Sequence, residues 1–210
     1  MSKILNSLNW RYATKKYDTS KKVGAEDITT LKEAMKLSVS SMGLQPYKVI
    51  FVDNTQLREQ LKSAAYNQSA ITDASHLIIF ANETNVSKKH IDGYLKNIAN
   101  TRGITIESLD AFNNSMQKFV GSLSPEANTD WSKRQAYIAM TTLINTAAYL
   151  KIDATPMEGF DEKKFNEILK LDSLGLNTAV IATIGYRHAD DAAQHLKKVR
   201  KSHAELFINL

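Results

Sequence analysis

Hydrophobic residues recur every three to four positions in several stretches of the chain, which is the spacing of a helix with one buried face. Ile28, Leu31 and Met35 are an example. Asn54 and Asp161 each precede such a stretch and suit the N-cap position, because their side-chain oxygens can accept a hydrogen bond from a free backbone N–H. Helices are therefore predicted over residues 3–11, 25–37, 54–66, 87–100, 107–123, 129–151 and 161–169.

Three other segments have the composition of strands. Residues 46–53 are rich in β-branched and aromatic side chains, and 76–81 and 177–186 contain continuous apolar runs typical of buried strands. Residues 125–128 and 154–161 are expected to be loops. Helix clearly exceeds strand, so the predicted class is α+β: one domain over 1–210, with a small central sheet flanked by several helices.

Composition narrows the possible functions. The 210 residues are 43% hydrophobic and 23% charged, as in ordinary globular proteins, and the absence of cysteine excludes disulfides, thiolate metal sites and a cysteine nucleophile. No apolar run is long enough to span a bilayer, and residues 1–11 lack the pattern of a signal peptide. We therefore expect a cytoplasmic protein without a membrane partner.

The common sequence motifs of several enzyme classes are missing. The chain contains no G-x-G-x-x-G, no Walker A sequence, no G-x-S-x-G and no H-E-x-x-H. The five histidines do not have the spacing of metal ligands. A Rossmann dinucleotide site, a phosphate loop, a serine hydrolase and a metal site are therefore not predicted.

Four short segments stand out, and each has an ordinary alternative. Residues 11–18 (RYATKKYD) could clamp an anion or form a solvated connection. Residues 40–46 (SSMGLQP) and 154–161 (ATPMEGFD) could bring backbone close to a ligand or be plain loops. The basic run 197–201 (KKVRK) could bind nucleic acid, bind a phosphate, or be a solvated tail.

Taken together and in this order, the four segments resemble the oxygen-insensitive NAD(P)H nitroreductase family, over essentially the whole chain from Arg11 to Arg200. The resemblance implies a nitroreductase-like α+β fold and an intertwined homodimer, with two FMN sites between the subunits. It also implies an enzyme that takes a hydride from NAD(P)H through flavin N5 and passes it to nitroaromatics or quinones in a ping-pong cycle. No nucleic-acid partner is expected.

The resemblance also assigns residues to the site. It implies no catalytic side chain and no metal; the backbone of Glu158 and Gly159 would lie near N5. Met42 and Phe119 would contact the substrate, and Ser40, Ser41 and Gly43 would come from the partner subunit. The expected FMN contacts are Arg11, Tyr12, Ala13, Lys15, Ser40, Ser41, Gly43, Asn67, Gln135, Pro156, Met157, Glu158, Gly159, Lys198 and Arg200.

The chain departs from the family pattern at several of these places. Tyr12 and Ala13 replace a His-Ser pair, Ala70 replaces a lysine, and Val120 replaces the second of two aromatic residues over the flavin ring. The last change suggests a more open substrate pocket. Two alternatives stay open: a flavin-binding protein with a different substrate, and a binder of anionic ligands or nucleic acid that uses the basic C-terminal cluster.

Overall fold

The computed structural model describes residues 2–210, and at its centre four antiparallel strands pair in the order β1-β2-β4-β3. The two central strands are almost wholly buried, as their apolar runs predict. The outer strands β1 and β3 each pair on one side only. The strands are β1 (Tyr47–Val52), β2 (His76–Glu83), β3 (Asp153–Met157) and β4 (Leu176–Gly185).

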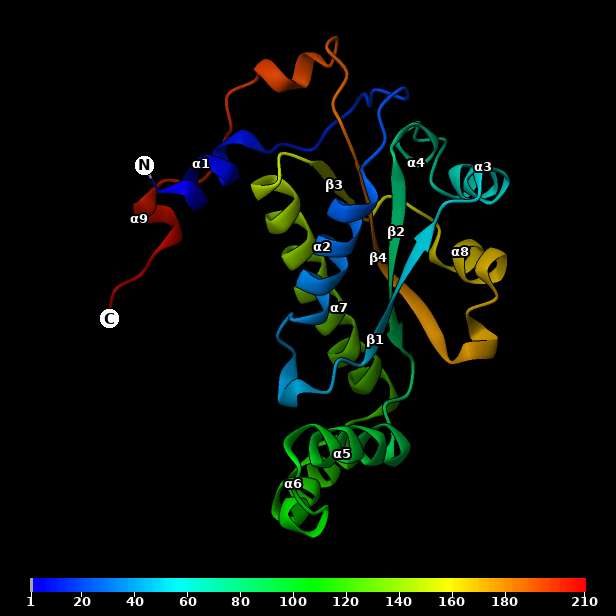
Figure 1. Cartoon of the computed structure of the whole chain (residues 1–210), viewed down its shortest axis with the longest axis vertical. Helices are drawn as coiled ribbons and strands as arrows, with labels where there is room; N and C mark the ends of the chain where they lie inside the picture. The colour runs from blue at the N-terminus through cyan, green and yellow to red at the C-terminus, as the bar shows by residue number, and fades with distance from the viewer. Residues whose placement is uncertain (1) are drawn as a thin grey trace.

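Helices cover both faces of the sheet (Figure 1). On one face lie α2 (Ala25–Lys36) and the long α7 (Pro125–Tyr149); on the other lie α3 (Thr55–Ala64), α4 (Ala70–Asp73) and α8 (Glu162–Leu169). Each layer buries its own hydrophobic cluster against the sheet. The α+β prediction is confirmed, and so are the caps: Asn54 and Asp161 accept hydrogen bonds from the N–H groups of Leu57 and Lys164.

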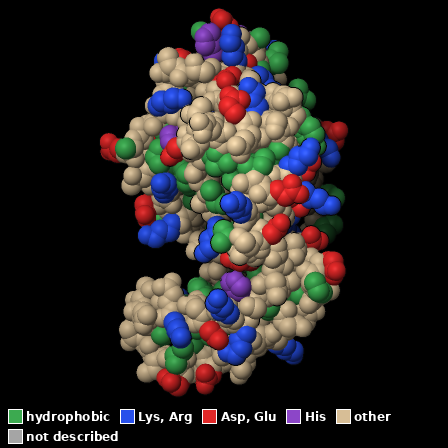
Figure 2. Space-filling model, turned by 90° about the vertical axis from the view of Figure 1, so that its right-hand side faces the viewer, with side chains coloured by type: hydrophobic (Ala, Val, Ile, Leu, Met, Phe, Trp, Pro, Cys, Tyr) green, Lys and Arg blue, Asp and Glu red, His purple; other side chains and the backbone are tan. Residues whose placement is uncertain are grey.

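A third hydrophobic cluster lies outside the sheet layers, where α5 (Lys88–Arg102) and α6 (Asp110–Gly121) pack around Trp131 near the start of α7. This lobe is separated from the main body by a notch (Figure 2). The helices α1 (Lys3–Trp10) and α9 (His203–Leu206) lie toward the opposite end of the molecule (Figure 1). Short 3-10 helices span Ser41–Gly43, Glu107–Leu109, Asp172–Leu174 and Ala192–His195.

The loop predicted over 125–128 is wrong, and the one predicted over 154–161 is wrong up to Met157 and confirmed for residues 158–161. Residues 153–157 form the edge strand β3 although they contain Pro156, because a proline can stand in a strand that pairs on one side only. Residues 125–128 are the first turn of α7: Ser124 caps the helix and Pro125 occupies the N1 position, where its missing N–H costs nothing. The short α4 was not predicted, and 107–109 is a 3-10 turn instead of α-helix.

Within residues 2–210, no helix is long and apolar enough to cross a membrane.

Candidate functional site

The segment 11–18 runs from α1 to the end of the sheet and is fastened there by buried polar contacts. The Tyr17 hydroxyl lies 3.1 Å from the Thr155 hydroxyl, 3.1 Å from the Thr183 hydroxyl and 3.1 Å from the Thr183 carbonyl. Burial raises the pKa of Tyr17 to about 12, so the phenol stays protonated at neutral pH. The backbone of the segment is thus held beside β3 and β4.

An ion pair next to this segment joins the buried Asp153 to the mostly buried Arg187. The Asp153 carboxylate accepts hydrogen bonds from Arg187 Nη2 at 2.6 Å, from the Arg187 backbone N–H at 2.8 Å and from the Thr14 hydroxyl at 3.2 Å. The Arg187 guanidinium carbon lies 4.2 Å from the centre of the Trp10 ring and 4.5 Å from that of Tyr12. These contacts form a rigid base under residues 10–14.

Arg11, Lys198 and Arg200, predicted from opposite ends of the sequence, line one cavity of about 450 Å³, which we call the cation pocket. Lys198 Nζ donates to the Leu8 and Arg11 carbonyls, and Arg11 Nη2 lies 3.4 Å from the Ala154 carbonyl oxygen. The pocket is lined by Asn9, Trp10, Arg11, Tyr12, Ala13, Pro156, Ala193, Gln194, Leu196, Lys197, Lys198 and Arg200.

The cations of this pocket lack an anionic partner. None of the three side chains forms an ion pair within residues 2–210, and the buried Nε of Arg11 has no hydrogen-bond acceptor. Burial and the nearby Arg200 lower the pKa of Arg11, and burial together with Arg11 and Arg200 lowers the pKa of Lys198. Such crowding of like charges is relieved when an anion binds, and the chemistry of the pocket therefore suits a phosphate.

A smaller cavity of about 170 Å³ continues along the same two segments. Lys15 lines it, and its ammonium has no ion-pair partner within residues 2–210. Ala70 also lines it, so the lysine that the family pattern would place there is replaced by a methyl group next to open space. The remaining lining residues are Thr14, Gln68, Ser69, Thr155 and Met157.

The turn after β3 is held from two sides. Gln68, beside the exposed Asn67, donates a hydrogen bond of 2.6 Å to the Gly159 carbonyl, and the Tyr137 hydroxyl donates one of 2.7 Å to the Glu158 carboxylate. Burial, with Glu158 adding to it, raises the pKa of Tyr137 to about 12. The sequence reasoning missed Gln68 and Tyr137; the proximity of Gln68 to Asn67 was the only signal.

The remaining predicted residues gather elsewhere. The Gln135 side-chain oxygen accepts a hydrogen bond of 2.8 Å from the Ser41 N–H, next to the strained turn at Met42 and Gly43, which have φ of 57° and 73°. Gln135 and Tyr137 are two residues apart on α7, and so point about 200° apart around its axis. The turn that contains Ser40, Ser41 and Gly43 therefore lies on the opposite side of α7 from the turn after β3, and one chain does not bring the two sets together.

Phe119 and Val120 lie in the lobe beside α5. The Phe119 ring packs edge-on against Trp131 with their centres 5.3 Å apart, and Val120 is buried in the same cluster. A larger side chain at position 120 would therefore meet this hydrophobic core. Val120 also lines a cavity of about 450 Å³ between this lobe and residues 84–88. The hypothesis that Val120 opens a substrate pocket stays a prediction.

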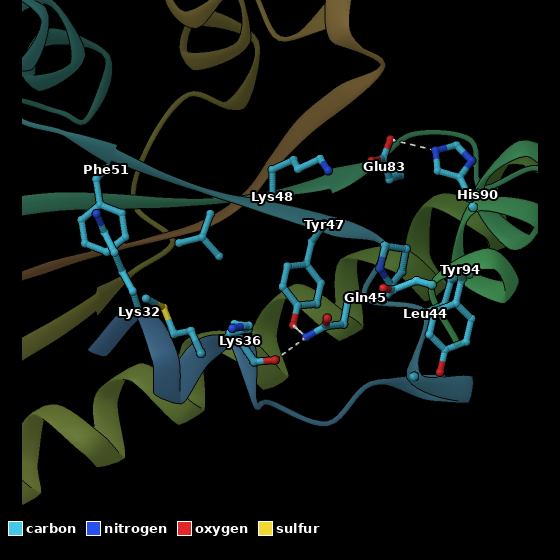
Figure 3. A pocket seen from close by; sticks show the side chains of 16 residues that line it. Lys32, Lys36, Leu44, Gln45, Tyr47, Lys48, Phe51, Glu83, His90 and Tyr94 are labelled. Carbon is cyan, nitrogen blue, oxygen red and sulfur yellow. Dashed lines mark hydrogen bonds and ion pairs between the residues drawn. The ribbon is translucent and has the colours of Figure 1, made fainter. Parts of the chain in front are cut away.

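A second hollow, which we call the β1 groove, runs along the free edge of β1 between α2 and α5, with a volume of about 760 Å³ (Figure 3). It also contains lysines, but these have partners or face solvent: Lys32 lies over the Phe51 ring at 4.6 Å and the exposed Lys36 pairs with Glu33 at 3.2 Å. A Glu83–His90 pair crosses its far side. None of the predicted FMN contacts except Gly43 lines it.

The sequence profile of the Nitroreductase family matches residues 8–186. The chain belongs to the nitroreductase family. It is 35% identical over 213 residues to the major NAD(P)H-flavin oxidoreductase of Aliivibrio fischeri, with 97% of each chain covered.

Solved structures share this fold at lower sequence identity. A candidate nitroreductase from Exiguobacterium sibiricum, in complex with FMN, superposes with a TM-score of 0.84 at 19% identity and covers 100% of this chain and 98% of its own. A gut-bacterial enone reductase superposes with a TM-score of 0.82 at 19% identity, covering 99% and 97%. Within residues 2–210, no group of three or more acidic or histidine side chains could hold a metal ion.

Proposed function

We propose that this chain is an FMN-dependent NAD(P)H oxidoreductase. The observation that carries the proposal is the cation pocket, where Arg11, Lys198 and Arg200 crowd together without an acidic partner and the Arg11 Nε lacks an acceptor. A phosphate dianion supplies both the charge and the acceptors that these groups lack. The FMN named for the E. sibiricum structure and the name of the A. fischeri relative support the same cofactor.

The cation pocket and the smaller cavity would bind different parts of FMN. Arg11, Lys198 and Arg200 would hold the phosphate, and Lys15 would place a positive charge beside the ring, where negative charge develops on reduction. Tyr137 and Gln68 hold the turn at Glu158 and Gly159 in place. When bound, FMN supplies the hydride chemistry, with NAD(P)H as donor and nitroaromatics or quinones as acceptors in alternate half-reactions.

The proposal includes a homodimer. Ser41 and Gln135 lie on the far side of α7 from the turn after β3, so they can meet an FMN held by Lys15 only if a second copy supplies them. An FMN complex that stays monomeric even at high protein concentration, measured by analytical ultracentrifugation, would contradict this part of the proposal.

A visible absorbance spectrum tests the function directly. We expect a yellow protein, or a colourless one that turns yellow with added FMN, and bleaching after anaerobic addition of NADH or NADPH. The faster nucleotide identifies the donor. A protein that binds FMN but is not bleached would overturn the oxidoreductase proposal, and a protein that binds no FMN would overturn the cofactor as well.

The acceptor is tested by steady-state kinetics. Parallel double-reciprocal lines, obtained when NAD(P)H is varied at several concentrations of menadione or nitrofurazone, are expected for alternating half-reactions. Intersecting lines would contradict the ping-pong cycle. Turnover of an enone, but of neither a quinone nor a nitroaromatic, would replace the acceptor class.

A further inference from the structure

Asp190 and Asp191 are neighbours in the sequence but differ in their surroundings. The Asp190 side chain is 71% exposed and pairs with Lys16 at 3.3 Å. Asp191 is only 3% exposed, although it stands in a charged stretch of the chain. A buried carboxylate is costly unless donors surround it, and its partners therefore indicate its role.

Four donors surround the Asp191 carboxylate. Its Oδ2 accepts hydrogen bonds from the Tyr12 hydroxyl at 2.9 Å, the Lys15 N–H at 2.8 Å and the Lys16 N–H at 3.2 Å. Its Oδ1 accepts from the Ala193 N–H at 3.1 Å. Burial acts to raise the pKa of Asp191, but the hydrogen bonds from Lys15 and Lys16 outweigh it and the pKa is lowered, so the group is ionised at neutral pH.

Three of these contacts, those from Tyr12, Lys15 and Lys16, join two segments about 176 positions apart in the sequence, and both segments carry cations of the site. The fourth, from Ala193, lies within the C-terminal segment. Tyr12 and its neighbour Arg11 line the cation pocket from one side, and the Ala193–Arg200 segment lines it from the other. Asp191 lies at their junction. It also fixes the backbone of Lys15, which lines the second cavity.

The contacts of Tyr12 show how it serves this junction. Its hydroxyl donates to Asp191, and its ring lies 4.5 Å from the Arg187 guanidinium carbon. The hydroxyl and the ring of Tyr12 are therefore both engaged in contacts within the protein. Tyr12 takes part in the site through its backbone and through its hold on Asp191.

We propose that Asp191 is a positioning residue for phosphate recognition: it holds Arg11 and Lys15 in register with Lys198 and Arg200. This inference rests on the proposed binding of FMN. A negative charge near an anion site opposes binding unless it is neutralised, and the four donors provide that neutralisation. Asp191 contacts neither the flavin nor the substrate in this proposal and acts only through the segments it joins.

The test compares FMN with riboflavin, which lacks the phosphate. Binding of each flavin to the apoprotein is measured by fluorescence quenching for the wild type, Asp191→Asn, Asp191→Ala and Tyr12→Phe, with Asp190→Asn as the matched control. We expect Asp191→Ala to weaken FMN binding by about tenfold or more and riboflavin binding much less. Without Asp191 the cations of the pocket shift, and their hydrogen bonds to the phosphate, which riboflavin lacks, are lost. Tyr12→Phe should shift the FMN-to-riboflavin preference in the same direction by less, and Asp190→Asn should leave it unchanged.

The outcomes separate this inference from the function itself. If Asp191→Ala and Asp191→Asn weaken both flavins equally, Asp191 only stabilises the fold and the inference is wrong. If Asp191→Ala does not fold, Asp191→Asn and Tyr12→Phe still report the ratio of the two affinities. If the wild type binds both flavins equally, the phosphate role of the cation pocket fails, and if it binds neither, the proposed function fails.

Discussion

The cation pocket and the β1 groove are both hollows lined by cations, but their charges are held in different ways. The groove is larger, about 760 Å³ against 450 Å³, and of its lysines Lys36 pairs with Glu33 and Lys32 lies over the Phe51 ring. In the pocket, Arg11 has a buried nitrogen without an acceptor and lies near two further cations. We therefore base the proposed anion site on the unpartnered nitrogen of Arg11 and the cations beside it, and not on the volume of a hollow or the number of its lysines.

The largest expected effect concerns the ion pairs beside the two hollows. Asp153→Asn removes the charge that compensates Arg187, and because the Asp153 side chain is only 2% exposed we expect the free energy of unfolding to fall by about 3 kcal/mol. The matched change Glu33→Gln breaks the exposed pair with Lys36 beside the groove. It should matter much less, because exposed pairs contribute on the order of 0.5 kcal/mol.

Urea unfolding of the apoprotein, followed by circular dichroism, measures both variants at one pH. Equal losses of stability in Asp153→Asn and Glu33→Gln would mean that the base of the cation pocket is no more rigid than the surface beside the groove. The structural contrast between the two regions would then have no energetic counterpart.

The next effect concerns the ligand. Arg11→Ala should weaken FMN binding by about 1.5–3 kcal/mol, as expected for a charged hydrogen bond, which is roughly 10- to 150-fold. Arg200→Ala, at an exposed position, should act in the same direction. Lys32→Ala, which removes a groove cation, should change the affinity by no more than about twofold, the range of ordinary surface substitutions.

Isothermal titration of FMN into the apoproteins gives these affinities. If Lys32→Ala weakened FMN binding as much as Arg11→Ala, the phosphate site would have to be assigned to the β1 groove. If neither change had an effect, neither hollow would be the phosphate site.

The same contrast explains how far the sequence could lead. Hydrophobic periodicity predicts most helices, and local composition predicts the strands β1, β2 and β4, because these features are local. The strand β3 was missed because Pro156 argues against a strand unless its place at the sheet edge is known. That place depends on pairing with β4, which no local pattern reveals.

The candidate site was predictable in its residue types but not in its arrangement. Arg11 and Arg200 were named through the family resemblance, since no local pattern links residues at opposite ends of the chain. Asp190 and Asp191 look alike in the sequence, yet one is solvated and the other buried among four donors. Gln68 and Tyr137 contact Gly159 and Glu158, which are distant in the sequence, so only the folded structure reveals these contacts.

The smallest expected effect is a pH dependence that distinguishes the lysines of the two hollows. Burial, Arg11 and Arg200 lower the pKa of Lys198 in the free protein, whereas a bound phosphate dianion favours the charged ammonium. Binding therefore takes up protons as the pH approaches the lowered pKa of Lys198, and FMN affinity should fall gradually as the pH rises from neutral toward that pKa. Tyr12 and Tyr17, with pKa values of about 12, do not titrate in this range. Lys198→Met should make FMN affinity depend less on pH, whereas Lys48→Met, at a lysine that also lines the β1 groove, should leave the pH dependence unchanged. The same pH dependence in the wild type and in Lys198→Met would show that Lys198 does not face the phosphate.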